Sequence, residues 1–394
     1  MNELTMPANN AFRHQDYVHG KPGAEFELLQ PSAPDAHESG TYRDRMAHLG
    51  EQLAAENVSA VYLIHGTLVG TDATGMIGVL GRFMPEWADM LGQQRKQIAD
   101  LIMGEWANYS EEYAQTLRQT INQRLDDSID VQRFLWESEN NHTGRANAAV
   151  RLIDELYSRV RDQSIKSGQR VQLWGHSHGG NVLAIVSNLL GGSLRSRSAF
   201  FRAAKPVYRR ADRTIDVPVW ARVRELLLKQ HRSDNPLAGI HLDMVTFGTP
   251  VRYGWDSGGY SRLTHFIYHR PTDGLAKYLA PFPPTLEQIY DATAGDFVQQ
   301  FFIAGTNFPV NLLAFRRWRA ERKLKKLLQG RHSSRKLLTW LNTGARVPDE
   351  GRAMLVDYST GDPEYAASVA GHAIYTHRNW LPFHLETLID GTDG

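Results

Sequence analysis

One stretch constrains the fold of this chain more than any other, residues 171–186, with the sequence VQLWGHSHGGNVLAIV. Its apolar first part predicts a buried strand and its apolar last part predicts a helix. Between them lies a turn in which Gly175 and Gly179 flank Ser177. Small residues at these positions let strand and helix approach closely. Ser177 is therefore expected at the head of a helix, where negative charge is stabilised.

Two other interpretations apply to the same turn. In the first, Ser177 only caps the following helix. In the second, His176 and His178 begin a zinc motif of the His-x-His-x-Asp-His type found in metallo-β-lactamase-like hydrolases. The positions that should then hold Asp and His hold Gly180 and Asn181. We therefore predict no metal at this turn.

The composition is that of a globular protein, with 42% hydrophobic and 22% charged residues among 394. The net charge of +1 gives no overall bias toward nucleic acid, and no nucleic-acid partner is predicted. Without cysteine the chain has no disulfide, thiolate metal site or cysteine nucleophile. The first residues show no secretory signal, and no apolar run reaches the length of a membrane span. We expect a cytoplasmic protein, or one exported without a cleavable signal.

Apolar runs along the chain alternate with helical patterns. The run preceding Ser177 is one predicted strand. Segments with helical periodicity, such as residues 146–161, lie between several of the runs. Strands joined by helices favour an α/β fold with a mostly parallel central sheet flanked by helices. The other predicted strands are residues 58–64, 131–136, 240–247, 263–270 and 352–358.

Several segments fall outside this alternation. Residues 1–40 are polar and are expected to form an arm outside the core. Helical, cap-like insertions are expected at about residues 68–128, 191–232 and 275–345. Within the last of these, residues 311–336 predict a basic amphipathic helix with aromatic residues, a pattern compatible with peripheral contact with an anionic membrane. A solvated basic face on an ordinary helix is the alternative.

The strand at residues 58–64 runs directly into His65-Gly66-Thr67. In a strand–turn–serine–helix architecture, a second loop of this kind supplies one of two backbone N–H groups that hold a negatively charged oxygen. We expect these donors to be the amides of Thr67 and of His178, the residue after the serine. By itself, His65-Gly66 is compatible with an ordinary turn at the end of a strand.

Candidates for an acid and a base follow later in the chain. Asp273 stands on a Pro-x-Asp-Gly loop after the second strand beyond the serine, and it is the expected acid. Such a loop is also a common turn, and Asp291 is the alternative acid. Three histidines follow the last predicted strand, of which His372 is the expected base. His384 and His377 are the alternatives, with packing or a substrate wall as their other roles.

Together these pieces resemble the α/β-hydrolase fold and, within it, the lipases and esterases. The resemblance runs from residue 58 to about residue 390. The Phe-Gly-Thr-Pro end of one strand is similar to that of many lipases. The matching segments are Leu63-Ile-His-Gly-Thr67, Gly175-His-Ser-His-Gly-Gly180, Thr246-Phe-Gly-Thr-Pro250, Asp273-Gly274 and Gly371-His372.

The resemblance implies a serine hydrolase that needs no cofactor. Ser177 would attack an ester carbonyl, His372 would take its proton, and Asp273 would orient the imidazole. The helical insertions and the basic segment favour a lipid-like ester, as for a lipase, an esterase or a phospholipase. The alternatives are a serine hydrolase of thioester or amide bonds, and a non-catalytic membrane- or protein-binding module on the same fold.

Overall fold

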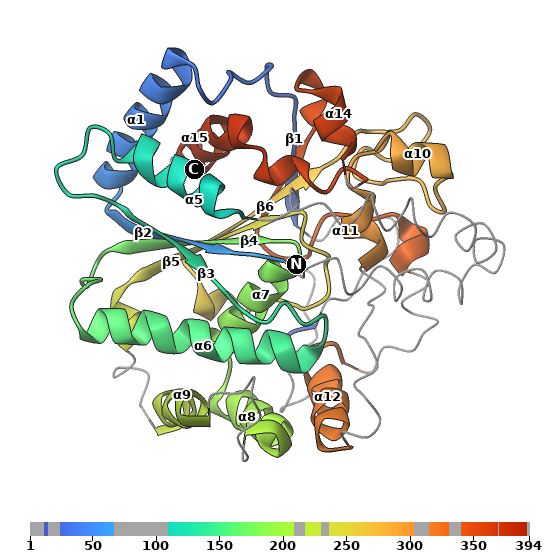
Figure 1. The fold of residues 1–394 in the computed structure, drawn as a ribbon. Coiled ribbons are helices and arrows are strands. Elements are labelled where there is room, and N and C mark those ends of the chain that lie inside the picture. The colour runs from blue at the N-terminus through green and yellow to red at the C-terminus, as the bar shows by residue number, and fades with distance from the viewer. Residues whose placement is uncertain are drawn as a thin grey trace.

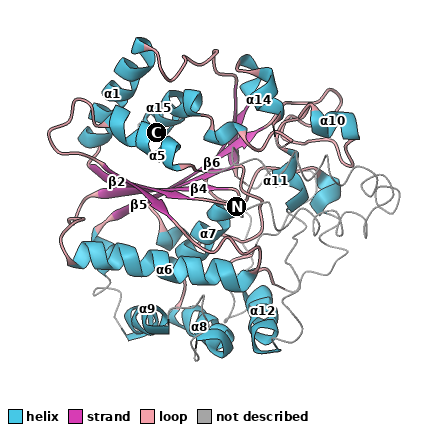
Figure 2. Cartoon of the chain, in the orientation of Figure 1, coloured by secondary structure: helices cyan, strands magenta, loops and turns pink. Residues whose placement is uncertain are grey.

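The chain forms an α/β fold built on one seven-stranded sheet (Figure 1, Figure 2). The computed structural model describes residues 12–14, 24–66, 109–208, 217–229, 236–302, 315–330, 340–368 and 370–391. The strand order is β1-β7-β6-β5-β4-β2-β3, and every pairing between neighbouring strands is parallel. The predicted fold class, a largely parallel sheet flanked by helices, is confirmed.

The central strands are buried almost along their whole length because helices cover both faces of the sheet. All their carboxyl ends meet at one edge, which we call the carboxyl edge. The strands are β1 (Glu25–Leu29), β2 (Val58–Ile64), β3 (Asp130–Phe134), β4 (Arg170–His176), β5 (His241–Phe247), β6 (Arg262–Tyr268) and β7 (Arg352–Val356).

Two layers of helices sandwich the sheet (Figure 1). One face carries α1 (Gly40–Ala55), α5 (Glu111–Ile121) and α15 (Leu381–Asp390). The other carries α6 (His142–Arg161), α7 (His178–Gly191), α8 (Leu194–Tyr208), α9 (Val217–Lys229) and α12 (Phe315–Leu328). Shorter helices are α10 (Leu286–Tyr290), α11 (Phe297–Phe302) and α14 (Pro363–Ala367). Single 3₁₀ turns occur at Pro236–Gly239, Ser257–Gly259, Tyr358–Thr360, Ile374–Thr376 and Arg378–Trp380.

Strand β4, which leads to the serine, contributes to a separate hydrophobic core on each face of the sheet. Leu173 belongs to the core beneath α6 and α7, and the next residue, Trp174, belongs to the core on the other face. Successive side chains of a strand point to opposite faces, so β4 is held from both sides. The indole N–H of Trp174 donates to Oε1 of Gln172 at 3.0 Å, which satisfies its polar group within the core.

The N-terminal segment differs from the expectation of an arm outside the core. Residues 25–29 form β1, which pairs with β7 at the edge of the sheet. Phe12 is buried and packs edge-on against Phe200, with ring centroids 6.1 Å apart. The polar composition of this segment is explained by its edge position, where most of the β1 side chains remain exposed or half-buried.

The expected insertions are only partly described. Residues 191–232 contain α8 and α9, which pack on the body of the protein, and the indole N–H of Trp220 donates to Asn147 at 2.8 Å. Residues 67–108 lie outside the described residues, so most of the insertion at 68–128 does too. Within the described ranges, no helix has the length and apolar character needed to cross a membrane.

Candidate active site

Ser177 occupies a strained turn between β4 and α7. Its backbone angles are φ 52° and ψ −128°, a region that a residue with a side chain rarely adopts. Three hydrogen bonds hold the turn. The Ser177 N–H donates to the Phe247 carbonyl at 2.8 Å, and the Ser177 carbonyl accepts from the Gly180 N–H at 3.1 Å and from the Thr249 hydroxyl at 2.8 Å. The end of β5 therefore supports the serine directly.

Gly179 shows why the turn needs a residue without a side chain. A Cβ at this position would lie 2.3 Å from the carbonyl oxygen of Ile64 and 2.8 Å from that of His65. Both atoms are backbone and cannot move aside cheaply. The start of α7 is therefore packed against the end of β2, which brings the His65-Gly66 loop beside the serine.

Gly66 is in close contact with Ser177. A Cβ on Gly66 would lie 2.7 Å from the Ser177 Cβ and 3.3 Å from its Oγ. The loop is held by His65, whose Nε2 accepts from the Trp136 N–H at 3.2 Å. The ring proton is then on Nδ1, which donates to the Gly66 carbonyl at 2.8 Å. Of the two expected oxyanion donors, His178 is the first residue of α7, and Thr67 lies outside the described residues.

A buried histidine–carboxylate pair lies at the same edge of the sheet. His372 Nδ1 donates to Oδ2 of Asp296 at 2.7 Å, and the two residues are 2% and 0% exposed. The other oxygen of Asp296 accepts from the Gln299 backbone N–H at 2.9 Å. Tyr375 also donates to Oδ2, at 3.0 Å, and its hydroxyl accepts from the Tyr268 N–H at 2.7 Å. These contacts leave the carboxylate little freedom to rotate.

The negative charge of Asp296 has a buried positive neighbour in Arg346. This guanidinium donates to the carbonyls of Tyr268 and Ala294 at 2.8 and 2.7 Å. Burial lowers the pKa of Arg346 to about 10, and its attraction to Asp296 opposes that shift. Arg346 therefore stays charged at neutral pH and offsets the cost of burying an ionised carboxylate.

His372 lies against the turn that carries the serine. Its ring centroid is 4.7 Å from that of His176, whose Nε2 donates to the His372 carbonyl at 3.3 Å. Burial holds the pKa values of His176 and His178 well below the ordinary value, and His372 adds to both shifts. The residues on either side of Ser177 are thus neutral and close to the His372 imidazole.

The remaining ring nitrogen of His372 makes no hydrogen bond to the part of the chain that the structure describes. Nε2 is buried and, among the described residues, has no hydrogen-bond partner. With Nδ1–H bound to a carboxylate, Nε2 carries the lone pair of the neutral imidazole. This conformation contains no bond from Nε2 to Ser177 Oγ. Such contacts are often long in a protein without substrate and tighten when substrate binds.

The expected pairing of His372 with Asp273 is wrong. Asp273 is exposed on the loop after β6, whereas the carboxylate on His372 belongs to Asp296. The chain leaves the carboxyl edge after β6 and returns to it, where His269 and Gly295 form an antiparallel bridge. The sequence signal for Asp296 is its position three residues before Gln299 at the start of an apolar helix, which is typical of an N-cap.

The alternative candidates lie elsewhere. His384 is fully buried, its Nε2 is 2.9 Å from the Tyr358 hydroxyl, and its ring packs on Phe247 at 4.9 Å. His377 packs on the Tyr365 ring at 4.0 Å. Asp291 is exposed at the end of α10. The structure therefore gives His384 and His377 packing contacts and leaves Asp291 in solvent.

His384 makes the stability of the fold sensitive to acid. Burial lowers its pKa from 6.5 to about 3. Between these values the unfolded chain binds more protons than the folded one, so stability falls as pH falls. In His384→Phe we expect the difference in unfolding free energy between pH 7.5 and pH 5.0 to shrink by about 2 kcal/mol. Urea titrations at both pH values measure this, and an unchanged difference would contradict a buried, neutral His384.

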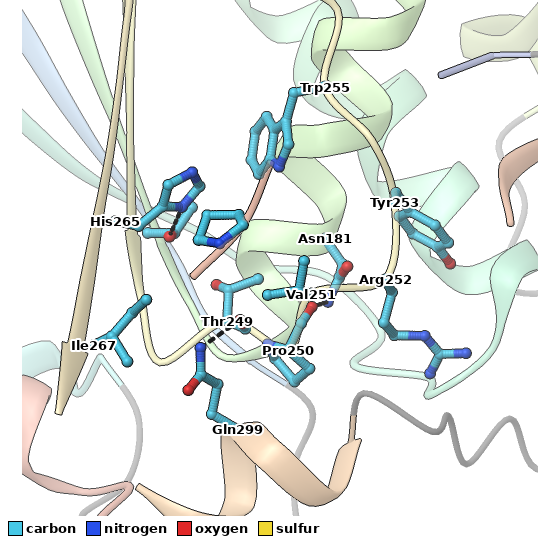
Figure 3. Close-up of a pocket in the computed structure, with 12 residues that line it drawn as sticks. Asn181, Thr249, Pro250, Val251, Arg252, Tyr253, Trp255, His265, Ile267 and Gln299 are labelled. Carbon is cyan, nitrogen blue, oxygen red and sulfur yellow. Dashed lines mark hydrogen bonds between the residues drawn. The ribbon is translucent and has the colours of Figure 1, made fainter. Parts of the chain in front are cut away.

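A small cavity lies between Gln299 and the loop that follows β5 (Figure 3). It has room for about one water molecule, which is too little for a substrate. The Gln299 side chain, on its wall, donates to the Thr249 carbonyl at 3.3 Å, and Thr249 in turn bonds the Ser177 carbonyl. Because the Gln299 N–H also donates to Asp296, these contacts link the loop that carries Asp296 to the turn that carries Ser177.

Comparisons with known proteins found no relative of this chain. No protein-family model, no curated protein and no solved structure matches the chain. Within the described residues, no group of three or more His, Asp or Glu side chains is placed to hold a metal ion. The chemistry of the site therefore has to be inferred from its own geometry.

Proposed function

We propose that the protein is a serine hydrolase that cleaves carboxylic esters of lipid-like substrates through an acyl-enzyme. One observation carries the proposal. A buried Asp296–His372 pair lies beside the strained turn of Ser177, and its second imidazole nitrogen is unbonded within the described ranges. A nucleophile, a base and a group that orients the base are the parts that such a reaction requires.

Each residue then has one role. His372 Nε2 accepts the Ser177 proton as Oγ attacks the ester carbonyl, and Asp296 stabilises the imidazolium that forms. The His178 amide, at the N-terminus of α7, is the proposed donor to the tetrahedral oxyanion, with Thr67 as the second donor. His372 returns the proton to the leaving alcohol. Water, activated by the same nitrogen, then hydrolyses the acyl-enzyme and restores Ser177.

The arrangement of the sheet supports an α/β-hydrolase assignment. In that fold the serine, the acid and the histidine follow one another along the chain at the ends of parallel strands. Here Ser177 follows β4, Asp296 lies beside the end of β6, and His372 comes after β7. Strand β1 is an addition at the far edge of the sheet, beyond β7.

The test compares wild type with Ser177→Ala on esters of increasing acyl length and on phospholipid vesicles. We expect serine-dependent hydrolysis that increases with chain length. Serine-dependent cleavage of thioesters or amides in place of esters would contradict the ester assignment and retain the nucleophile. A folded protein without serine-dependent hydrolysis of any acyl bond would overturn the enzyme proposal and favour a binding module.

Gly66 provides a second test, because it limits the space beside the nucleophile. In Gly66→Ala the new methyl group would press on the Ser177 Cβ, so the Gly66 loop or the serine turn must shift. We expect kcat on a soluble ester to fall about 10²-fold, the effect of displacing a reacting group by roughly 1 Å. Gly40→Ala, whose Cβ would meet no atom within 4 Å, is the matched control. Equal activity of the two variants would contradict the close contact at Gly66.

A further inference from the structure

Helices α8 and α12 lie side by side (Figure 1). Both carry exposed basic side chains, which together we call the basic face. The apolar residues on the buried side of α12 are Ala320, Leu324 and Leu328, which belong to the core. These leucines therefore pack inward, whereas an amphipathic helix bound to a membrane would turn its apolar residues to the lipid. Every exposed charged side chain of the two helices is basic, namely Arg195, Arg202, Lys205, Arg316, Arg319, Arg322, Lys323, Lys325 and Lys326.

The one acidic residue of the two helices does not reduce this charge at the surface. Glu321 is 9% exposed, and its carboxylate accepts from the backbone N–H groups of His142 and Thr143 at 2.8 and 2.9 Å. It therefore stabilises the N-terminus of α6. Because α6 begins after the end of β3, this contact holds α12 near the carboxyl edge. The basic side chains of α12 and Ser177 are thus at the same edge of the sheet.

The arrangement of the cations on α12 suits a flat, negatively charged partner. Arg316, Arg319, Lys323 and Lys326 are three or four residues apart and so form one stripe along the helix. Apolar side chains accompany the charges. Leu194, at the start of α8, is 58% exposed. Trp318 is half-buried, and the Arg322 Cζ lies over its ring, 4.7 Å from the ring centroid. Apolar groups among cations favour partition into a lipid interface over contact with phosphates alone.

We propose that the basic face of α8 and α12 docks on a membrane surface that contains anionic phospholipids. The inference rests on the proposed function and narrows its substrate class to esters presented at a charged lipid surface. Basic side chains close to such a surface each add attraction that fades within a Debye length. Docking at this edge brings the ester groups of the lipid to the side of the molecule that carries Ser177.

Vesicle sedimentation with the full chain carrying Ser177→Ala tests the proposal without hydrolysis of the probe. The vesicles contain phosphatidylcholine alone or with about one third phosphatidylglycerol. We expect binding to the mixed vesicles to be at least about tenfold tighter and to weaken as NaCl is raised. Equal binding to both vesicles, or none to either, would overturn the proposal. Tighter binding to a DNA duplex of equal phosphate concentration would also overturn it.

Matched charge reversals locate the surface. Arg319→Glu with Lys323→Glu is expected to weaken binding to the mixed vesicles at least about tenfold. Arg43→Glu with Lys166→Glu changes the net charge equally at exposed positions outside α8 and α12 and should have less than about a twofold effect. Equal losses of vesicle binding in the two double variants would contradict docking through the basic face, because net charge alone would then explain the binding. Hydrolysis of a soluble ester, measured with the Ser177 side chain present, tests the proposed function separately. Vesicle binding can therefore contradict the docking proposal while the hydrolase proposal stands, and the reverse also holds.

Discussion

Asp296→Asn is expected to lower kcat on a soluble ester about 10⁴-fold, the loss typical when the acid of such a triad becomes an amide. The contacts of Asp296 explain the size of the effect. Its Oδ1 accepts from the Gln299 N–H, so the amide oxygen of asparagine will keep that place. The amide nitrogen then faces His372 Nδ1 and donates to it. The ring proton moves to Nε2, and His372 can no longer accept a proton from Ser177.

Asp273→Asn and Asp291→Asn are the matched controls for this prediction. Both carboxylates are exposed, and we expect each variant to keep kcat within about twofold of wild type, as is usual for surface substitutions. Thermal unfolding of all three variants separates a loss of chemistry from a loss of fold. A large loss of kcat in Asp273→Asn together with an active Asp296→Asn would contradict the prediction. It would return the role of acid to Asp273, as the sequence predicted, and leave the Asp296–His372 pair without a catalytic role.

The serine turn and the positions of most strands along the chain could be predicted because their signals are local. A buried parallel strand shows as an apolar run, and the turn at Ser177 depends on glycines within two residues of it. Strand β1 was missed for a physical reason. It lies at the edge of the sheet, so its sequence, Glu-Phe-Glu-Leu-Leu, lacks the continuous apolar character of the central strands. Only its pairing with β7 makes it a strand.

Asp296 could not be assigned from sequence because its position depends on a tertiary contact. The chain departs after β6, forms α10, and returns to bridge His269 with Gly295. No local pattern shows which carboxylate of such an excursion comes back to the sheet. Arg346 and Tyr375 were missed for the same reason, since each acts through residues distant in sequence.

The choice among histidines was open at the sequence level because a buried histidine and a catalytic base look alike in a single sequence. In the structure their surroundings differ. His372 has a carboxylate on one ring nitrogen and, as far as the chain is described, no partner on the other. His384 has a tyrosine hydroxyl on Nε2 and aromatic rings of β5 and β6 on its faces. A base needs an orienting acid and an open nitrogen, and of these two only His372 has both.

His372→Ala is expected to abolish turnover almost completely, with a loss in kcat of about 10⁶-fold, as when the histidine of a comparable triad is removed. The double variant with Ser177→Ala should be no slower than either single variant, because the proposed mechanism has the two residues act in one proton transfer. His384→Phe is the control, and we expect it to lower stability and to keep kcat within about tenfold. Steady-state kinetics on a soluble ester, with unfolding curves for each variant, measures both effects. An active His372→Ala beside an inactive, folded His384→Phe would transfer the role of base to His384 and leave Ser177 as the nucleophile.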